Sequence, residues 1–203
     1  MKLKAKFIYL ISPNTIYHNF YYDLIAVLKT KKVKYFQLRL KKTSRKKILV
    51  ISKKIKEICK TFNVKFIIND NPSIADKIGA DGCHLGQNDM SINDARNILK
   101  NKIIGITCHN STKKAKEAIK NKADYIALGA FNLSKTKKVK YIAKINHLKK
   151  IRKLTNIPII AIGGIDQYNY KKLLLNKADF LAISNFIWKN KILKPEEAIK
   201  KIK

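Results

Sequence analysis

Short apolar runs alternate with longer segments in which apolar residues recur every three or four positions, along the whole 203-residue chain. The short runs are rich in β-branched residues and have the length of buried parallel strands. The longer segments have the spacing of amphipathic helices, as where Ile48, Ile51, Ile55, Ile58 and Phe62 follow one another. We therefore expect strands at 6–11, 33–38, 64–68, 81–84, 103–107, 124–128, 158–162 and 179–183, and helices at 17–28, 48–62, 92–99, 112–119, 145–154 and 168–175, with a short helix after the third strand and a helical tail.

Eight strands, each followed by a helix, predict an α/β protein with the (β/α)8 architecture, the TIM barrel. A doubly wound open sheet is the alternative. The connections are short and no change of composition divides the chain, so we expect residues 1–203 to form a single TIM-barrel domain. Asp81, Asp124 and Asp179 each follow an alanine at the start of a predicted strand. This repeat indicates structural turns at the N-terminal face of the barrel, and we assign these aspartates no catalytic role.

The charge of the chain changes this picture little. A net charge of +32 is typical of nucleic-acid-binding proteins. However, the lysines lie on every predicted helix and at both termini, and the chain is also rich in Ile and Asn, so a general drift in composition explains them better than a dedicated nucleic-acid site. The charge would steer a polyphosphorylated substrate. No apolar run is long enough to span a membrane, and three cysteines without a CxxC pair favour the reducing cytoplasm.

Two carboxylates follow neighbouring strands of the predicted barrel. Asp70 comes directly after one strand, and Asp89 follows the next strand along the chain. Because the C-terminal ends of parallel strands lie on one side of the sheet, we expect both side chains at the mouth of the barrel. Paired carboxylates so placed suit Mg²⁺, which proteins hold with one or two carboxylates and substrate phosphate oxygens. For either aspartate taken alone, an N-cap of the following helix is the simpler interpretation.

Cationic and polar side chains end the second predicted strand. Gln37, Arg39 and Lys41 alternate, so an extended chain points all three to one side. Beside two carboxylates, such a group is suited to an anionic diphosphate and its metal, with arginine as a fork and lysine as a point charge. Further candidates at strand ends are Asn69, His84, Thr107, Ser134, Thr136, Lys137, Gly163, Gly164, Ile183 and Ser184.

Several of these signals have plain structural alternatives. A basic surface loop explains the tetrapeptide at 134–137, and a tight turn explains Gly163-Gly164. His84 and His109 could line the pocket or be satisfied core histidines. Each histidine follows a cysteine, which suggests zinc, but adjacent residues of a strand face opposite sides. We therefore reject zinc and a Cys-His nucleophile, and we expect Cys83 and Cys108 to be buried, inert thiols.

Six motifs occur in order: QLRLK at 37–41, IND at 68–70, ADGCHLGQND at 80–89, GITCH at 105–109, SKTK at 134–137 and AIGGI at 161–165. Together they closely resemble the thiamine-phosphate synthase family, transferases of thiamine biosynthesis with a barrel fold. Single motifs are modest, whereas six in the right order over nearly the whole chain are specific. The resemblance implies that a pyrimidine diphosphate and a thiazole phosphate condense and release diphosphate, with Mg²⁺ as cofactor.

The resemblance also implies roles for single residues. Arg39, Lys41, Asn69 and Lys137 would hold the diphosphate, with Arg39, Lys41 and Lys137 assisting its departure, and Gln37 and Thr107 would lie near the pyrimidine. Asp70 and Asp89 would bind Mg²⁺. Ser134, Thr136, Gly164, Ile183 and Ser184 would hold the thiazole phosphate. Asn71 departs from the pattern, since the family commonly has arginine there, and the prolines that usually precede the SKTK loop are missing.

The main alternative is a sister barrel, the thiazole tautomerase, an isomerase with a histidine at the position of His109. That family tends to lack the Gly-Gln-x-Asp metal residue and the full Gln-x-Arg-x-Lys set, and this chain has both. The sequence therefore favours the synthase. A non-catalytic, basic nucleic-acid-binding barrel is a third alternative. The oligomeric state stays open, and an oligomer is compatible with the sequence.

Overall fold

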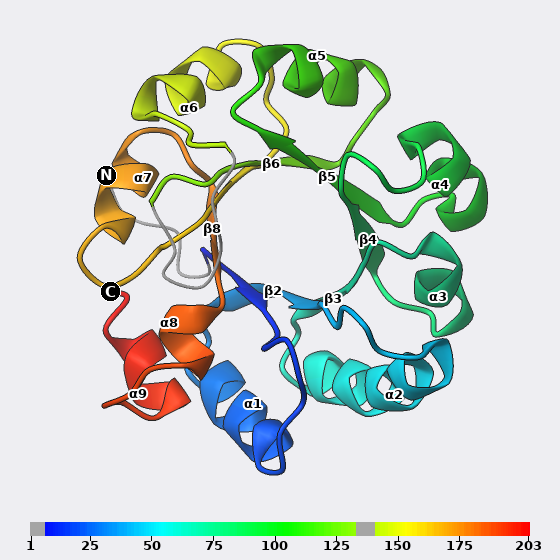
Figure 1. Cartoon of the computed structure of the whole chain (residues 1–203), viewed down its shortest axis with the longest axis vertical. Coiled ribbons are helices and arrows are strands. Elements are labelled where there is room, and N and C mark those ends of the chain that lie inside the picture. Colours follow the sequence, from blue (N-terminus) through cyan, green and yellow to red (C-terminus); the bar gives the residue numbers. More distant parts are fainter. Residues whose placement is uncertain (1–6, 133–140) are drawn as a thin grey trace.

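The short apolar runs of the sequence form the β-strands of a barrel. The computed structural model describes residues 7–132 and 141–203. Within these residues the strands are β1 (Ile8–Ile11), β2 (Val33–Leu38), β3 (Lys65–Asn69), β4 (Gly82–Leu85), β5 (Ile103–His109), β6 (Tyr125–Gly129), β7 (Ile159–Ile162) and β8 (Phe180–Ile183). They pair in chain order, all parallel, and β8 pairs with β1 to close the barrel (Figure 1). The (β/α)8 prediction is confirmed, and the open-sheet alternative is wrong.

Helices surround this barrel (Figure 1). In the described residues they are α1 (Phe20–Lys29), α2 (Arg45–Thr61), α3 (Pro72–Lys77), α4 (Ile92–Leu99), α5 (Thr112–Lys120), α6 (Ile145–Arg152), α7 (Tyr170–Leu175), α8 (Asn185–Trp188) and α9 (Pro195–Lys200). The expected helical tail is two helices, and Pro195 starts the second because proline suits a first helical turn. None of the helices in the described ranges is both long and apolar enough to cross a membrane.

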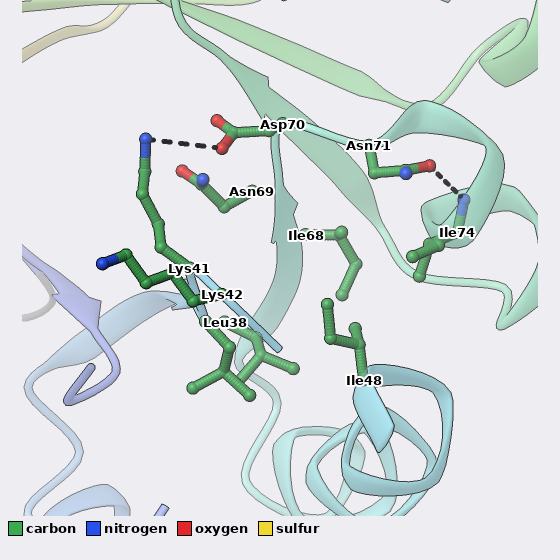
Figure 2. A pocket seen from close by; sticks show the side chains of 10 residues that line it. Leu38, Lys41, Lys42, Ile48, Ile68, Asn69, Asp70, Asn71 and Ile74 are labelled. Atoms are coloured by element: carbon green, nitrogen blue, oxygen red, sulfur yellow. Dashed lines mark hydrogen bonds and ion pairs between the residues drawn. The ribbon is translucent and has the colours of Figure 1, made fainter. Parts of the chain in front are cut away.

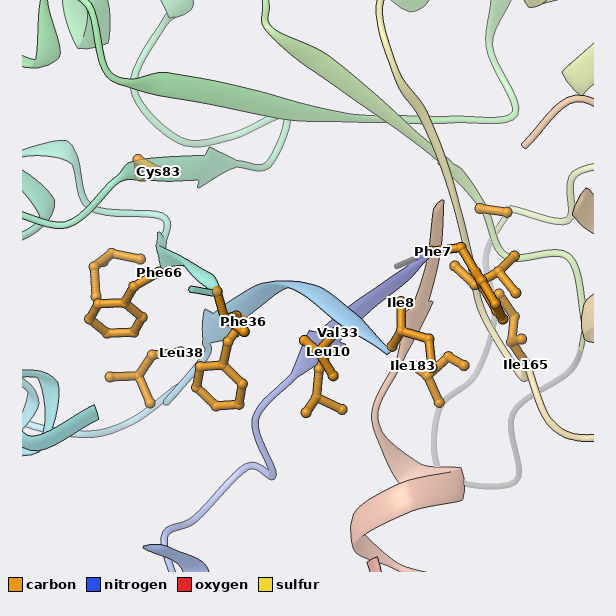
Figure 3. Packing of buried hydrophobic residues seen from close by; sticks show 14 of the residues in the cluster. Phe7, Ile8, Leu10, Val33, Phe36, Leu38, Phe66, Cys83, Ile165 and Ile183 are labelled. Atoms are coloured by element: carbon orange, nitrogen blue, oxygen red, sulfur yellow. The ribbon is translucent and has the colours of Figure 1, made fainter. Parts of the chain in front are cut away.

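Strand alternation sorts the apolar side chains into two layers. One layer, between strands and helices, includes Phe36, Leu38 and Phe66 (Figure 3). A smaller layer fills the barrel interior and includes Tyr9 and Tyr125. Each large side chain buried in this way stabilises the fold by about 1.5–3 kcal/mol. The interior layer forms a floor beneath the mouth of the barrel.

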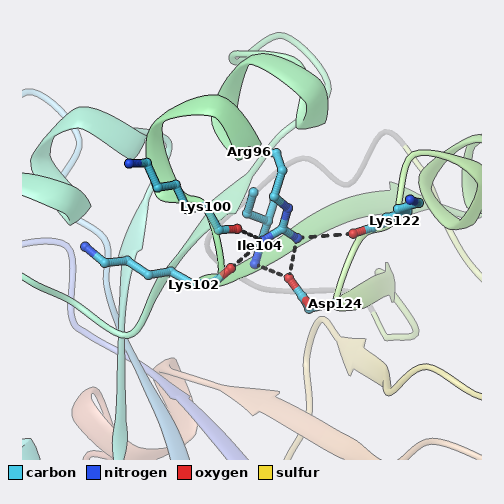
Figure 4. Close-up of polar contacts among 6 residues, drawn as sticks. All are labelled: Arg96, Lys100, Lys102, Ile104, Lys122 and Asp124. Atoms are coloured by element: carbon cyan, nitrogen blue, oxygen red, sulfur yellow. Dashed lines mark hydrogen bonds and ion pairs between the residues drawn. The ribbon is translucent and has the colours of Figure 1, made fainter.

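The strand-starting aspartates tie neighbouring strands together. Asp124 accepts a hydrogen bond from the backbone N–H of Ile104 (2.7 Å) and pairs with Arg96 (2.7 Å). Arg96 also donates to three backbone carbonyls nearby (Figure 4). Asp81 accepts from Phe66 N–H and Asp179 from Ile159 N–H in the same way. The predicted structural role of these three aspartates is confirmed.

The fifth strand is longer than the sequence predicts. It extends to His109, and its register with β6 shifts between Thr107 and His109, so that β5 has one residue more than its partner there. This is a β-bulge, a feature that turns a side chain away from strict alternation. His109 has φ of 53°, in the left-handed region. Because of the bulge, the side chain of His109 does not follow the alternation that places Thr107 at the barrel mouth.

Candidate active site

The two carboxylates predicted to bind metal do meet at the mouth. Asp70 follows β3 with a left-handed backbone (φ 65°), and its N–H donates to the carbonyl of His84 on β4 (2.8 Å). Asp89 accepts a hydrogen bond from the N–H of Gly86 (2.6 Å). A Cβ on Gly86 would lie 2.8 Å from Oδ2 of Asp89, so glycine makes room for this turn. The backbone thus directs both carboxylates to one place.

Neither carboxylate is the side-chain cap of the helix that follows it. The side chain of Asn71 accepts from the N–H of Ile74 and caps α3. Ser91 accepts from the N–H of Asp94 and caps α4. The N-cap interpretation of Asp70 and Asp89 is therefore wrong for these helices. Asn71, which departs from the family pattern, has a defined structural role here.

The electrostatics of the pair fit a bound cation. Partial burial raises the pKa of Asp70, and a hydrogen bond and the charge of Asp89 raise this pKa further. Lys41 and Arg39 oppose the rise but do not cancel it. The negative charge of Asp70 is thus disfavoured beside Asp89, and a divalent cation between the two carboxyl groups would relieve this cost. Within residues 7–132 and 141–203, no group of three or more His, Cys, Asp or Glu side chains gathers around a metal position.

Cations approach the pair from the end of β2. The Lys41 Nζ lies 3.8 Å from Oδ2 of Asp70, and both side chains keep contact with solvent (Figure 2). The backbone of Arg39 is fixed by its N–H, which donates to the hydroxyl of the buried Ser12 (2.9 Å). The charge of Arg39 lowers the pKa of both Asp70 and His84, which indicates that its guanidinium lies near both. Arg39, Lys41 and the carboxylates thus share one site.

Gln37 and Asn69 form a polar pair deeper in the mouth. The Gln37 amide nitrogen donates to Oδ1 of Asn69 (2.6 Å), and Gln37 is only 2 % exposed. In this arrangement Gln37 presents a carbonyl acceptor and Asn69 presents an N–H donor. A ligand with a hydrogen-bond donor beside an anionic group would match both. The predicted alternation at the end of β2 correctly directs Gln37 inward.

His84 lies at the centre of a buried chain of hydrogen bonds. Its Nδ1 is 2.9 Å from the hydroxyl of Tyr125, and its Nε2 is 2.8 Å from Oγ1 of Thr107. The Tyr125 hydroxyl is in turn 2.8 Å from that of Tyr9. Burial lowers the pKa of His84 to about 4, with Asp89 opposing this and Arg39 adding to it. His84 is therefore both a satisfied core histidine and, through Thr107, a neighbour of the mouth.

Sequence reasoning missed Tyr9 and Tyr125. The one residue that could have indicated a large ring inside the barrel is Gly105, on the neighbouring strand β5. A Cβ at Gly105 would lie 1.8 Å from a ring carbon of Tyr125, so this glycine leaves space for the ring. The other candidate histidine, His109, packs against Tyr141 with ring centroids 4.5 Å apart and planes tilted by 32°. Burial, with Lys114, lowers the pKa of His109.

The glycine pair after β7 has positive φ angles of 105° at Gly163 and 57° at Gly164. A Cβ on Gly163 would lie 2.3 Å from the Cβ of Ala130, so the glycine lets the chain after β6 approach closely. Ser184 follows β8, and its hydroxyl donates to the carbonyl of Ser12 (3.1 Å). Ile183 is buried among the outer apolar layer, which leaves its backbone as the part that could contact a ligand. Ser134, Thr136 and Lys137 lie outside the described residues.

A cavity of about 440 Å³ flanks the site where β2 and β3 end (Figure 2). Its walls are mainly apolar, with Leu38, Ile48 and Ile68 on one side, while Lys41 and Asp70 lie at its polar part. Leu38 and Ile68 belong to the outer apolar layer, so the cavity lies beside the barrel mouth rather than over it. The chemistry of the site is therefore assigned from the convergent polar groups at the mouth.

The cysteines lie apart from these groups. Cys83 and Cys108 are buried in the outer apolar layer, on the opposite side of their strands from His84 and Thr107. Burial raises the pKa of both thiols, to about 12 for Cys108. The prediction of buried thiols is confirmed, and a raised pKa disfavours the reactive thiolate form.

A closed (β/α)8 barrel with carboxylates, cations and amides at the C-terminal ends of its strands defines a barrel enzyme that acts at its mouth. Comparison with known proteins narrows this class. The family model for thiamine monophosphate synthase matches residues 8–187. A thiamine-phosphate synthase of Pelagibacter ubique is 61 % identical over 203 residues, covering 100 % of this chain and 98 % of the relative. One from Nitrosomonas eutropha is 41 % identical, covering 77 % of this chain and 74 % of the relative.

A solved structure is similar over the same extent. The thiamine phosphate pyrophosphorylase from Pyrococcus furiosus superposes with a TM-score of 0.86 at 26 % identity, covering 98 % of this chain and 93 % of that one. The chain belongs to the thiamine-phosphate synthase family. It is accordingly a transferase of thiamine biosynthesis, as the six motifs predict, and the tautomerase alternative is not favoured.

Proposed function

We propose that the enzyme joins the methylene carbon of 4-amino-2-methyl-5-(diphosphooxymethyl)pyrimidine to the ring nitrogen of a thiazole phosphate, and releases diphosphate. The observation that carries this proposal is the meeting of Asp70 and Asp89 beside Lys41 and Arg39. The two carboxylates suit a magnesium ion, and the two cations suit the diphosphate bound to that ion. Together they fit a magnesium diphosphate better than a metal ion alone or a diphosphate alone. Residues 1–203 would act as one barrel domain, in the cytoplasm.

Asp70 and Asp89 would hold Mg²⁺, because they supply hard oxygen ligands that lie close to each other. When bound, the ion neutralises diphosphate oxygens and makes diphosphate a better leaving group. Arg39 would contact the diphosphate as a fork and Lys41 as a point charge. Asn69 would add an N–H donor, since its Oδ1 already accepts from Gln37. These groups lie at the ends of three adjacent strands, β2, β3 and β4.

The pyrimidine would lie deeper, against Gln37 and Thr107. The carbonyl of Gln37 suits the exocyclic amino group, and the hydroxyl of Thr107 suits a ring nitrogen. As the carbon–oxygen bond breaks, diphosphate takes the electron pair and leaves a pyrimidine-methyl cation. The thiazole nitrogen then supplies the electron pair of the new carbon–nitrogen bond. No protein nucleophile is needed, so the side chains position the reactants and stabilise charge.

The thiazole phosphate would bind where β7 and β8 end. The positive φ angles of Gly163 and Gly164 hold the chain in a conformation that exposes backbone, and Ser184 lies beside the end of the neighbouring strand β1. Barrels often bind phosphate at these two loops. Ser134 and Thr136 complete this part of the proposal from the sequence alone, and Lys137, also from the sequence alone, would contact the diphosphate.

Omission of one reactant at a time tests the function. The purified protein is incubated with both heterocycles and Mg²⁺, and diphosphate and the coupled product are measured separately. We expect both to appear in equal amounts, and neither to form at a comparable rate without the pyrimidine diphosphate, the thiazole phosphate or the metal. Isomerisation of a thiazole carboxylate phosphate, with no coupling, would contradict the proposal.

A further inference from the structure

The buried chain Tyr9–Tyr125–His84–Thr107 runs from the barrel floor to the mouth. Its three contacts measure 2.8, 2.9 and 2.8 Å, and three of its four side chains are buried. The His84 ring also stacks on the Tyr125 ring, with centroids 5.6 Å apart and planes 13° from parallel. Packing thus fixes the positions of these atoms, while the direction of each hydrogen bond depends on where the protons lie.

Counting donors and acceptors decides that direction. If Nδ1 of His84 carried a proton, it would donate to the Tyr125 oxygen, and one of the two phenol hydrogens would then lack an acceptor among the described residues. A doubly protonated ring has the same defect. If Nδ1 is bare, Tyr9 donates to Tyr125 and Tyr125 donates to Nδ1, so that every hydrogen has an acceptor. Buried hydroxyls without a partner are rare, which favours the bare Nδ1.

The proton of His84 therefore lies on Nε2, which donates to Oγ1 of Thr107. This contact uses the hydroxyl of Thr107 as an acceptor, so its own hydrogen must point elsewhere. Thr107 is partly exposed at the mouth, whereas His84 is buried. The hydrogen of Thr107 is consequently directed to whatever occupies the mouth.

We propose that Tyr125, supported by Tyr9, is a positioning residue that fixes the tautomer of His84 and thereby makes the Thr107 hydroxyl a hydrogen-bond donor to the substrate. The specificity that follows is for an acceptor, such as the ring nitrogen of an aminopyrimidine, at that point of the site. The substrate part of this inference rests on the proposed function, whereas the direction of the hydrogen bonds does not.

The tautomer can be measured in the free, full-length protein. Nitrogen-15 NMR of labelled histidines distinguishes a protonated Nε2 from a protonated Nδ1, and a His84→Asn variant identifies the signal among the four histidines. We expect the Nε2–H form for His84 in the wild type at neutral pH. In Tyr125→Phe, which removes the donor to Nδ1, a share of the other tautomer should appear. A protonated Nδ1 in the wild type would overturn the proposal.

Steady-state kinetics test the consequence for the substrate. Tyr125→Phe should raise KM for the pyrimidine diphosphate by about 3- to 10-fold, the effect of one weakened hydrogen bond, and should change kcat less. Thr107→Val should also raise the KM for the pyrimidine diphosphate. Thr107→Ser keeps the hydroxyl donor and should have a KM close to that of the wild type. The KM for the thiazole phosphate should stay unchanged in all three.

Tyr35→Phe is the matched control. The Tyr35 ring packs on Tyr9 and Tyr125 with centroids 5.5 and 6.1 Å apart, but its hydroxyl makes no hydrogen bond to another described residue. An equal rise of KM in Tyr35→Phe and Tyr125→Phe, or no rise in Tyr125→Phe, would refute the positioning role. Absence of any turnover in the wild type would instead contradict the proposed function and leave the NMR result to decide the tautomer.

Discussion

Lowering the pH should destabilise the protein through His84. Burial in the barrel lowers the pKa of His84 from the ordinary value of 6.5 to about 4. Between these values the unfolded chain binds a proton at this residue and the folded chain does not. The free energy of unfolding therefore falls as the pH drops from about 6.5 to about 4, and the loss is complete below the lower value. A shift of this size corresponds to about 3 kcal/mol.

Urea unfolding at a series of pH values between 7 and 4.5 measures this loss. His84→Gln is the comparison, because glutamine keeps a polar side chain and does not titrate. Asp70 acts in the opposite direction, since its raised pKa makes the folded state bind the proton more tightly, and Asp70→Asn removes that contribution from both proteins. We expect a steeper loss of stability with falling pH when His84 is present. Equal slopes with and without His84 would refute this expectation.

Further predictions concern single side chains around the mouth. His109→Ala should leave diphosphate release largely intact, whereas the loss of a general acid or base would cost about 10²–10⁴ in rate. Lys137→Ala should lower kcat on the order of 10²–10³ by removing the charge that we propose to stabilise the departing diphosphate, and Lys135→Ala, the control, should not. Gly86→Ala should raise the Mg²⁺ concentration needed for half-maximal activity, because its Cβ would displace the carboxylate of Asp89, which we propose as a metal ligand. Asn71→Ala should lower the free energy of unfolding by about 1 kcal/mol, measured in urea, through loss of the α3 cap.

The spacing of apolar residues along the chain was enough to predict the strands and helices, because each strand or helix buries one apolar face of its own. The range 33–38 for β2 and the range 92–99 for α4 agree with the structure to the residue. The convergence of Asp70 and Asp89 was also predictable, since it depends only on two neighbouring parallel strands. The position of His109 was not, because a bulge interrupts the alternation on which the prediction relied.

Contacts across the barrel could not be predicted from the sequence. Tyr9 and Tyr125 are 116 residues apart, and their hydrogen bond exists only because the closed barrel brings the inward faces of β1 and β6 together. Spacing along the chain contains no sign of such a pair. The N-caps illustrate a different limit. Asp70 and Asn71 are adjacent polar residues before one helix, and only the backbone angles decide that Asn71 caps it.

We propose that Asp70 and Asp89 bind a metal ion and that this ion binds diphosphate. Isothermal titration of inorganic pyrophosphate into the full-length protein tests it most directly, with and without Mg²⁺, for the wild type, Asp70→Asn and Asp89→Asn. We expect tight binding only in the wild type with Mg²⁺, and binding weakened at least about tenfold in each variant. Binding that is equally tight in EDTA, or unchanged in both variants, would show that Asp70 and Asp89 hold no such ion and would leave the lysines and arginine as the whole anion site.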